Sequence, residues 1–202
     1  MILKRWAAAL LAAAGLAIIS AAPSHAQGAV TPDDAEWAEL SCIYTALMEV
    51  DDDAYYTVVD AYITEATTGD LFEAAASVIT DAATACADQY GWTDAQMDAA
   101  LTMGVAGTVA DAIESWFLDE GYSDEEIDAI IGLVELISDE DVLTFLSDDW
   151  RRDEAFLASI ETQLQGAGLD DDSGMMDMGL LLLETYLIGM YQSERWVTLA
   201  DG

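Results

Sequence analysis

Histidine and lysine are nearly missing from this chain of 202 residues. It has one of each, His25 and Lys4, and both lie within the first 26 residues. Ser-His-Asp and Cys-His mechanisms need an imidazole, and Schiff-base chemistry needs a lysine. Classical zinc sites need histidine and cysteine ligands. We therefore do not expect these enzyme classes, or zinc, haem or iron–sulfur binding, in the rest of the chain. Carboxylate-only mechanisms such as glycoside hydrolysis remain open.

The first 26 residues have three features of a secretory signal peptide. Lys4 and Arg5 give a positively charged start, residues 6–20 are apolar, and Ser24-His25-Ala26 has the small-x-small pattern of a cleavage site. An uncleaved membrane anchor is the alternative, but the apolar stretch is short and consists mostly of Ala and Gly. We expect cleavage of residues 1–26 and export to a bacterial periplasm or secretion.

Positive charge is also scarce in the remaining part, residues 27–202, which we expect to form one acidic domain. It contains forty Asp and Glu residues and three arginines, a formal net charge of 3 minus 40, or −37. Nucleic acid and anionic lipid headgroups repel such a chain, so neither is expected as a partner. A high-salt habitat would explain the acidity without any ligand, because salt screens the charges and the acidic surface stays soluble.

Proline occurs only at Pro23 and Pro32, so the strongest helix breaker is absent from the interior of the domain. Apolar residues recur at steps of three and four, and no segment alternates as a strand does. The sequence predicts an all-α fold, a single-domain irregular bundle of about seven to eight amphipathic helices. Thr31 should cap the first helix and Gly69 should end the second. The expected apolar stripes cover residues 37–47, 55–66, 71–86, 97–117, 127–137 and 156–164, with a short helix over 138–147 and a last one after Gly174.

The last expected helix has an apolar run from Met178 to Tyr191, interrupted by Glu184. This run is too short to span a bilayer of roughly 30 Å, so we expect a central core helix and no membrane span after cleavage. Burial could raise the pKa of Glu184 and make it a functional acid. The interpretation that we favour places Glu184 at the rim of the core, bonded to water, a tyrosine or an arginine.

Two nine-residue segments, 91–99 and 121–129, resemble each other. In each, a glycine can end one helix in the left-handed conformation and an aromatic residue can pack the corner. Thr or Ser can then cap the next helix, with Gln or Glu three residues on. The pattern suggests two related helix-turn-helix units, although the interpretation that we favour is that the same good helix-capping residues simply occur twice. A solenoid would need a third copy, which is not evident.

Cys42 and Cys86 are the only two cysteines. Export would place them in an oxidising compartment, where an isolated pair normally forms a disulfide. A catalytic thiol would need a nearby imidazole or cation to lower its pKa, and histidine and lysine are missing from residues 27–202. Closing a loop of about 45 residues stabilises by roughly 4 kcal/mol in the chain-entropy model. We predict a structural disulfide.

Two aspartate clusters are candidate calcium sites, since Ca²⁺ prefers oxygen ligands. One is Asp51-Asp52-Asp53, and the other comprises Asp170, Asp171, Asp172 and Asp177. The second is not an EF-hand, because glycine falls at position five and a leucine occupies position twelve. The simpler interpretation is that these acids are solvated and start helices, where the helix dipole favours negative charge.

The sequence thus favours an exported, soluble protein that is not an enzyme and acts by binding or structural interaction. Its partner would be an unknown protein or a small apolar ligand. Trp92, Tyr122 and Trp150 could line a groove for it, or could simply close the core. A Ca²⁺-binding or buffering protein is the second hypothesis, and a carboxylate-only enzyme is the third. No cofactor other than Ca²⁺ is expected.

Overall fold

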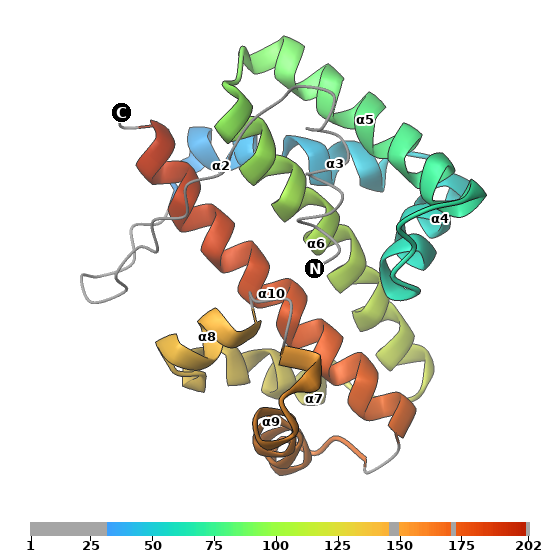
Figure 1. Ribbon diagram of the computed structural model, residues 1–202, viewed down its shortest axis with the longest axis vertical. Coiled ribbons are helices and arrows are strands. Elements are labelled where there is room, and N and C mark those ends of the chain that lie inside the picture. The colour runs from blue at the N-terminus through green and yellow to red at the C-terminus, as the bar shows by residue number, and fades with distance from the viewer. Residues whose placement is uncertain (1–31, 146–149, 171–172, 201–202) are drawn as a thin grey trace. The chain divides into compact units, whose positions relative to one another are not determined.

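The computed structural model describes residues 32–145, 150–170 and 173–200 (Figure 1). The expected signal peptide, residues 1–26, lies outside these described residues. Within them the chain forms nine α-helices and two short 3-10 helices and no strand, so the predicted all-α class is confirmed. The elements are α2 (Asp34–Leu40), α3 (Cys42–Met48), α4 (Asp52–Ile63), α5 (Asp70–Tyr90), α6 (Asp94–Asp119), α7 (Asp124–Ile131), η1 (Gly132–Leu136), α8 (Asp139–Phe145), η2 (Trp150–Arg152), α9 (Glu154–Gly166) and α10 (Ser173–Ala200).

The chain divides into two compact units. Of the described residues, the first, called unit 1 below, contains residues 32–109 and 189–200. The second, unit 2, contains Ala110–Ile188. Helices α6 and α10 each contribute one part to each unit. The expected extent of the domain, residues 27–202, stays a prediction.

The first expected helix is in fact two helices, α2 and α3, because Ser41 leaves the helical conformation (φ −82°, ψ 0°). Asp33 caps α2, with its side chain accepting the N–H groups of Ala35 and Glu36. The Glu36 side chain reaches back to the N–H of Asp33, which completes a capping box. Thr31 lies outside the described residues, and the structure places the cap two residues later than predicted. Trp37 is 49% exposed, whereas the apolar stripe predicted it on the buried face.

Helix α4 ends at Ile63, well before Gly69. Glu65 takes a positive φ of 53°, which turns the chain out of the helix. Gly69, with φ 88°, precedes the first residue of α5 and so begins the next helix instead of ending this one. Val58, Val59 and Tyr62 of the predicted stripe are buried, and α4 packs against α5.

The two similar segments form the two turns that the sequence predicts. Gly91 ends α5 with φ 69°, and Gly121 follows α6 with φ 99°, both in the region that favours glycine. After the first turn, Thr93 and Gln96 exchange side-chain and backbone hydrogen bonds of 3.0 and 3.3 Å. Ser123 and Glu126 do the same after the second, at 2.9 and 3.4 Å. The helix pairs α5–α6 and α6–α7 are therefore joined by turns of the same kind, each with a glycine at positive φ followed by a Thr or Ser that caps the next helix.

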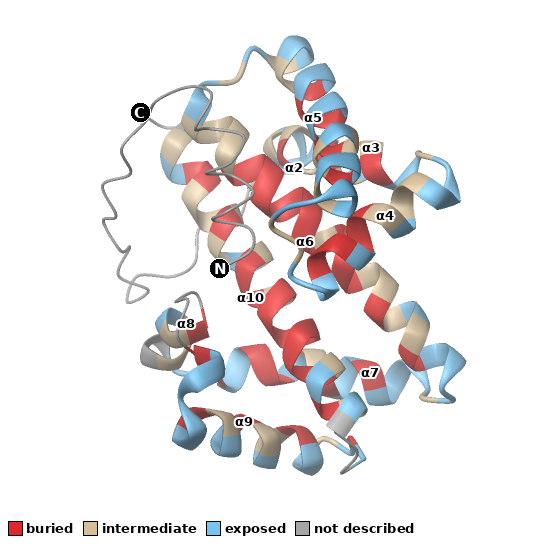
Figure 2. Cartoon of the chain, turned by 45° about the vertical axis from the view of Figure 1, so that its right-hand side comes forward, coloured by how far each residue is buried: buried red, intermediate tan, exposed pale blue. Residues whose placement is uncertain are grey.

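Helix α6 is buried on almost every side over residues 99–110, with Gly107 as the intermediate position (Figure 2). Within unit 1 it crosses α3 closely. A Cβ atom on Gly104 would lie 2.8 Å from Ile43 Cγ2 and 2.9 Å from the Tyr44 backbone nitrogen. The Tyr55 hydroxyl on α4 also donates to the Thr108 carbonyl. The small residue at position 104 is what allows the two backbones to approach.

Cys42 and Cys86 form the predicted disulfide. Cys42 is the first residue of α3, and Cys86 lies near the end of α5 on its buried side. Their Cα atoms are 6.0 Å apart. Because α3 and α5 also pack against each other, the covalent bond reinforces a contact that burial already makes within unit 1.

In unit 2, α10 is a core helix, as predicted. Leu180, Leu181, Leu182 and Leu183 are at most 6% exposed. Gly179 lets α10 approach the residues that follow α9, since a Cβ there would lie 2.5 Å from Leu169 Cδ2. None of the helices in residues 32–145, 150–170 and 173–200 combines the length and apolar character that a membrane crossing requires.

Two mid-helix glycines give a matched test of the close crossing. We expect Gly104→Ala to destabilise the fold by about 1–3 kcal/mol, because the methyl group would overlap Ile43 and the Tyr44 backbone. Gly189→Ala in α10 meets no atom within 4 Å and should stabilise by about 0.5–1 kcal/mol through helix propensity. Urea unfolding followed by circular dichroism measures both. Equal effects of the two substitutions would contradict the proposed role of Gly104.

Candidate functional site

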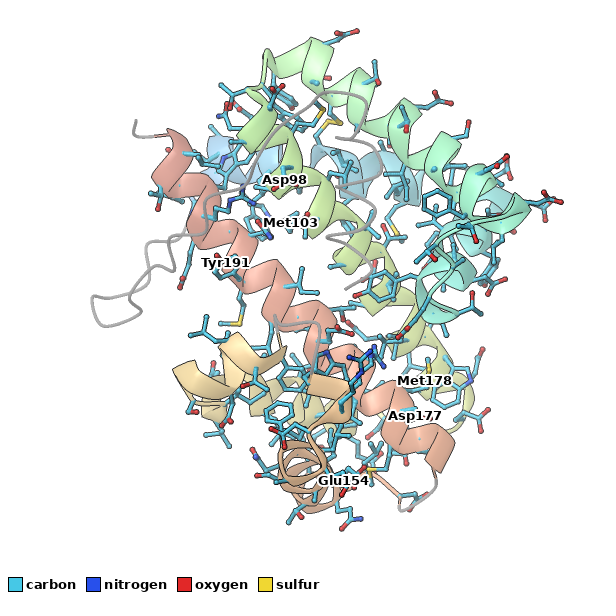
Figure 3. The ribbon with its side chains drawn as sticks, viewed as in Figure 1. Asp98, Met103, Glu154, Asp177, Met178 and Tyr191 are labelled. Atoms are coloured by element: carbon cyan, nitrogen blue, oxygen red, sulfur yellow. A yellow bond between two sulfur atoms is a disulfide. The ribbon has the colours of Figure 1, made fainter. Side chains whose placement is uncertain are left out.

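The predicted calcium cluster is only partly within the described residues. Asp171 and Asp172 lie outside them, while Asp170 and Asp177 are both exposed (Figure 3 labels Asp177). The backbone N–H of Asp170 donates to the Tyr122 hydroxyl at 3.2 Å. Among the residues that the structure describes, no group of three or more potential ligands is placed to hold a metal ion. Calcium binding by this segment stays a prediction.

The other aspartate cluster starts α4. The Asp51 side chain accepts the N–H of Ala54 at 3.0 Å, and Asp52 and Asp53 occupy the first turn. This is the helix-starting role expected of these acids, since negative charge is favourable at a helix N-terminus.

Glu184 is buried, at 6% exposure, and not at the rim of the core as predicted. One carboxylate oxygen accepts the indole N–H of Trp150 at 3.2 Å, and the other accepts from Arg151 at 3.0 Å. The Arg151 guanidinium in turn stacks over the Trp150 ring, 4.4 Å from its centroid. The partner is an arginine, as predicted. The burial escaped prediction because the acid's partners come from residues more than thirty positions earlier in the chain.

A second ion pair lies in unit 1. Arg195 near the end of α10 bonds to Asp98 near the start of α6, at 2.6 Å (Figure 3 labels Asp98). The Asp98 side chain is 13% exposed, and Gln192 also accepts from Arg195 at 3.3 Å. Two of the three arginines in residues 27–202 thus neutralise carboxylates that the fold has largely withdrawn from water.

The three corner aromatics mainly close the core. Trp150 is 2% exposed and packs on Phe145, with ring centroids 5.1 Å apart. Tyr122 meets Phe117 edge to face at 5.2 Å. Trp92 stacks on Tyr90 and meets Trp196 edge to face. These contacts favour the interpretation of Trp92, Tyr122 and Trp150 as packing residues.

Trp92 differs from Trp150 in one respect. Its indole N–H is buried and has no hydrogen-bond partner among the residues that the structure describes. A buried donor without a partner costs about 1–3 kcal/mol relative to a satisfied one. The two tryptophans therefore carry the same donor, an indole N–H, in opposite states. The N–H of Trp150 is bonded to a carboxylate, and that of Trp92 is unsatisfied within the described part of the chain.

One pair that sequence reasoning missed links α6 to α10 within unit 2. The Tyr186 hydroxyl donates to Glu114 Oε1 at 2.7 Å. Burial raises the pKa of Glu114, Asp111 and Asp128 raise it further by repulsion, and the bond from Tyr186 opposes them. Burial and Glu114 raise the pKa of Tyr186, so its hydroxyl remains a donor. Because the partners are 72 positions apart in the chain, no local spacing could have indicated this pair.

A wide, open depression lies beside Arg152, Asp153, Glu154 and Ala155 at the start of α9 (Figure 3 labels Glu154). Asp153 caps the helix by accepting from Ala155 and Phe156. The depression is too open to exclude water from a reaction, so it offers a surface and not an enclosed site.

No protein-family model matches the chain, and comparisons with curated proteins and with solved structures give no match either.

The opposite states of the two indoles lead to a prediction. We expect Trp150→Phe to destabilise by about 1–3 kcal/mol, because it removes a donor from a buried carboxylate. Trp92→Phe removes an unpartnered donor and should be close to neutral. Urea unfolding at pH 7.5 gives both values.

Loss of volume at Trp150 is separated from loss of the hydrogen bond by a double-mutant cycle with Glu184→Met, which removes the acceptor of the indole N–H. We expect a coupling of about 1 kcal/mol between positions 150 and 184. A Trp92→Phe cost as large as that of Trp150→Phe, or zero coupling in the cycle, would contradict the assigned role of the indole N–H.

Proposed function

We propose that this chain is an exported, non-catalytic helical protein that works by binding a partner at its surface, in a bacterial periplasm or outside the cell. The proposal of export rests on the charge, apolarity and cleavage pattern of residues 1–26. The proposal of binding rests on the side chains that the fold leaves in water.

The observation that carries the proposal is the exposure of large apolar side chains on an acidic surface. Tyr56 on α4 is 58% exposed, and Ile63, seven residues later on the same helix face, is 38% exposed. Asp52, Asp53 and Asp60 are exposed on the same helix. Aromatic residues are enriched at protein interfaces, where they supply contact area at low entropic cost.

The carboxylates that are withdrawn from water support a structural role for the interior. Glu184 and Asp98 are held by arginines, and Glu114 is held by Tyr186. A carboxylate enzyme needs acids that reach a substrate, and these three are engaged inside their own units. The exposed helix surface is therefore the better candidate for function.

The charge of the chain indicates the chemistry of the partner. A domain with a formal net charge of −37 repels a second copy of itself and attracts cationic surfaces. We propose a partner that offers basic residues around an apolar patch, since this combination matches aspartates flanking Tyr56 and Ile63. Association of this kind is faster at low salt than at high salt.

Site-specific photo-crosslinking in the native envelope tests the proposal. A photoreactive phenylalanine analogue at Tyr56 should give a discrete adduct whose yield falls as NaCl is raised. The matched control is the same analogue at Ser77, an exposed position on α5. Adducts of equal yield at both positions, no adduct at Tyr56, or retention of the chain in the cytoplasm would each contradict it.

A further inference from the structure

Glu114 is a carboxylate in unit 2 whose surroundings oppose its charge. It is half-buried on α6 and accepts a 2.7 Å hydrogen bond from Tyr186 on α10. Two more carboxylates act on it, Asp111 one turn earlier on α6 and Asp128 on α7. A proton on Glu114 would therefore relieve both the partial burial of its charge and the repulsion from Asp111 and Asp128.

The hydrogen bond is compatible with both protonation states of Glu114. Tyr186 remains the donor, because burial and the neighbouring carboxylates raise the pKa of its hydroxyl. The carbonyl oxygen of a protonated Glu114 accepts this bond just as a carboxylate oxygen does. Protonation thus removes a buried charge without breaking the contact between α6 and α10.

We propose that Glu114, Tyr186, Asp111 and Asp128 form a proton-operated contact that holds unit 2 more firmly in mildly acidic surroundings than at neutral pH. The proton is taken up by Glu114 and the tyrosine stays neutral throughout. The response is a property of the fold of unit 2, whatever partner the surface binds.

The direction follows from linkage. Burial raises the pKa of Glu114 in the folded chain above its ordinary value of 4.5, so the folded state binds more protons than the unfolded state between these two pKa values. The stabilisation from Glu114 is fully present at pH values below its pKa in the unfolded chain. It is lost as the pH rises through the pKa of Glu114 in the folded chain.

Glu126 provides an internal control in the same unit. The Ser123 backbone N–H and hydroxyl lower the pKa of Glu126 in the capping box that begins α7. The contribution of Glu126 to stability therefore depends on pH in the opposite way. It is present above the pKa of Glu126 in the unfolded chain and is lost as the pH falls through its pKa in the folded chain. Replacing either glutamate by glutamine removes one negative charge, so the general relief of repulsion is common to both variants.

The experiment measures urea midpoints of the purified chain, Glu114→Gln and Glu126→Gln between pH 5.0 and 7.5. We expect Glu114→Gln to have a higher midpoint than the unsubstituted chain at pH 7.5, with the advantage shrinking towards pH 5.0. At pH 7.5 the urea midpoint of Glu126→Gln should be lower than that of Glu114→Gln. The difference between the two midpoints should shrink as the pH is lowered towards 5.0.

Carbon-13 NMR of the side-chain carboxyl groups gives a direct second readout. The titration midpoint of Glu114 should lie above, and that of Glu126 below, those of the exposed glutamates. Asp128→Asn should move the Glu114 midpoint down, because it removes one repelling charge. The proposal is overturned if Glu114 titrates at or below the exposed glutamates, or if both glutamine variants show the same pH dependence.

Discussion

Repulsion among carboxylates is the constraint under which this fold is built. Forty acidic side chains face three arginines in residues 27–202. Like charges lie closer together in a compact chain than in an unfolded one, so they destabilise the folded state. Burial of apolar surface must outweigh that repulsion. Helix α6 over residues 99–110 and α10 over residues 179–188 are accordingly buried on nearly every side, and the Cys42–Cys86 disulfide reinforces the packing of α3 on α5.

The acids that the chain carries are also used as structural groups. Asp33, Asp51 and Asp153 each cap a helix by accepting backbone N–H groups. Negative charge there is favourable because the helix dipole places positive potential at the N-terminus. Two of the three arginines in residues 27–202 lie beside acids that are largely withdrawn from water. Arg151 and Arg195 neutralise Glu184 and Asp98, and leaving the buried Glu184 carboxylate unpaired would cost about 3–5 kcal/mol.

Local signals in the sequence predicted the features that depend on neighbouring residues. The all-α class followed from apolar periodicity, and the two turns at Gly91 and Gly121 followed from their glycine and capping residues. The break at Ser41 was not predicted, because the apolar stripe continues across it. The burial of Glu184 and the Glu114–Tyr186 bond were not predicted either. Both depend on which helices pack together. Partners that are 33 to 72 positions apart produce no periodic pattern in the sequence that could have predicted them.

If repulsion is the governing constraint, the free energy of unfolding must depend on ionic strength. The most direct measurement is that free energy at pH 7.5 as NaCl is raised from 0.01 M to 0.3 M, a range over which the screening length falls from about 30 Å to well under 10 Å. We expect a steady rise, because salt screens the carboxylates more effectively in the compact state. A free energy that is independent of NaCl, or that falls, would contradict the claim that carboxylate repulsion limits the stability of this fold.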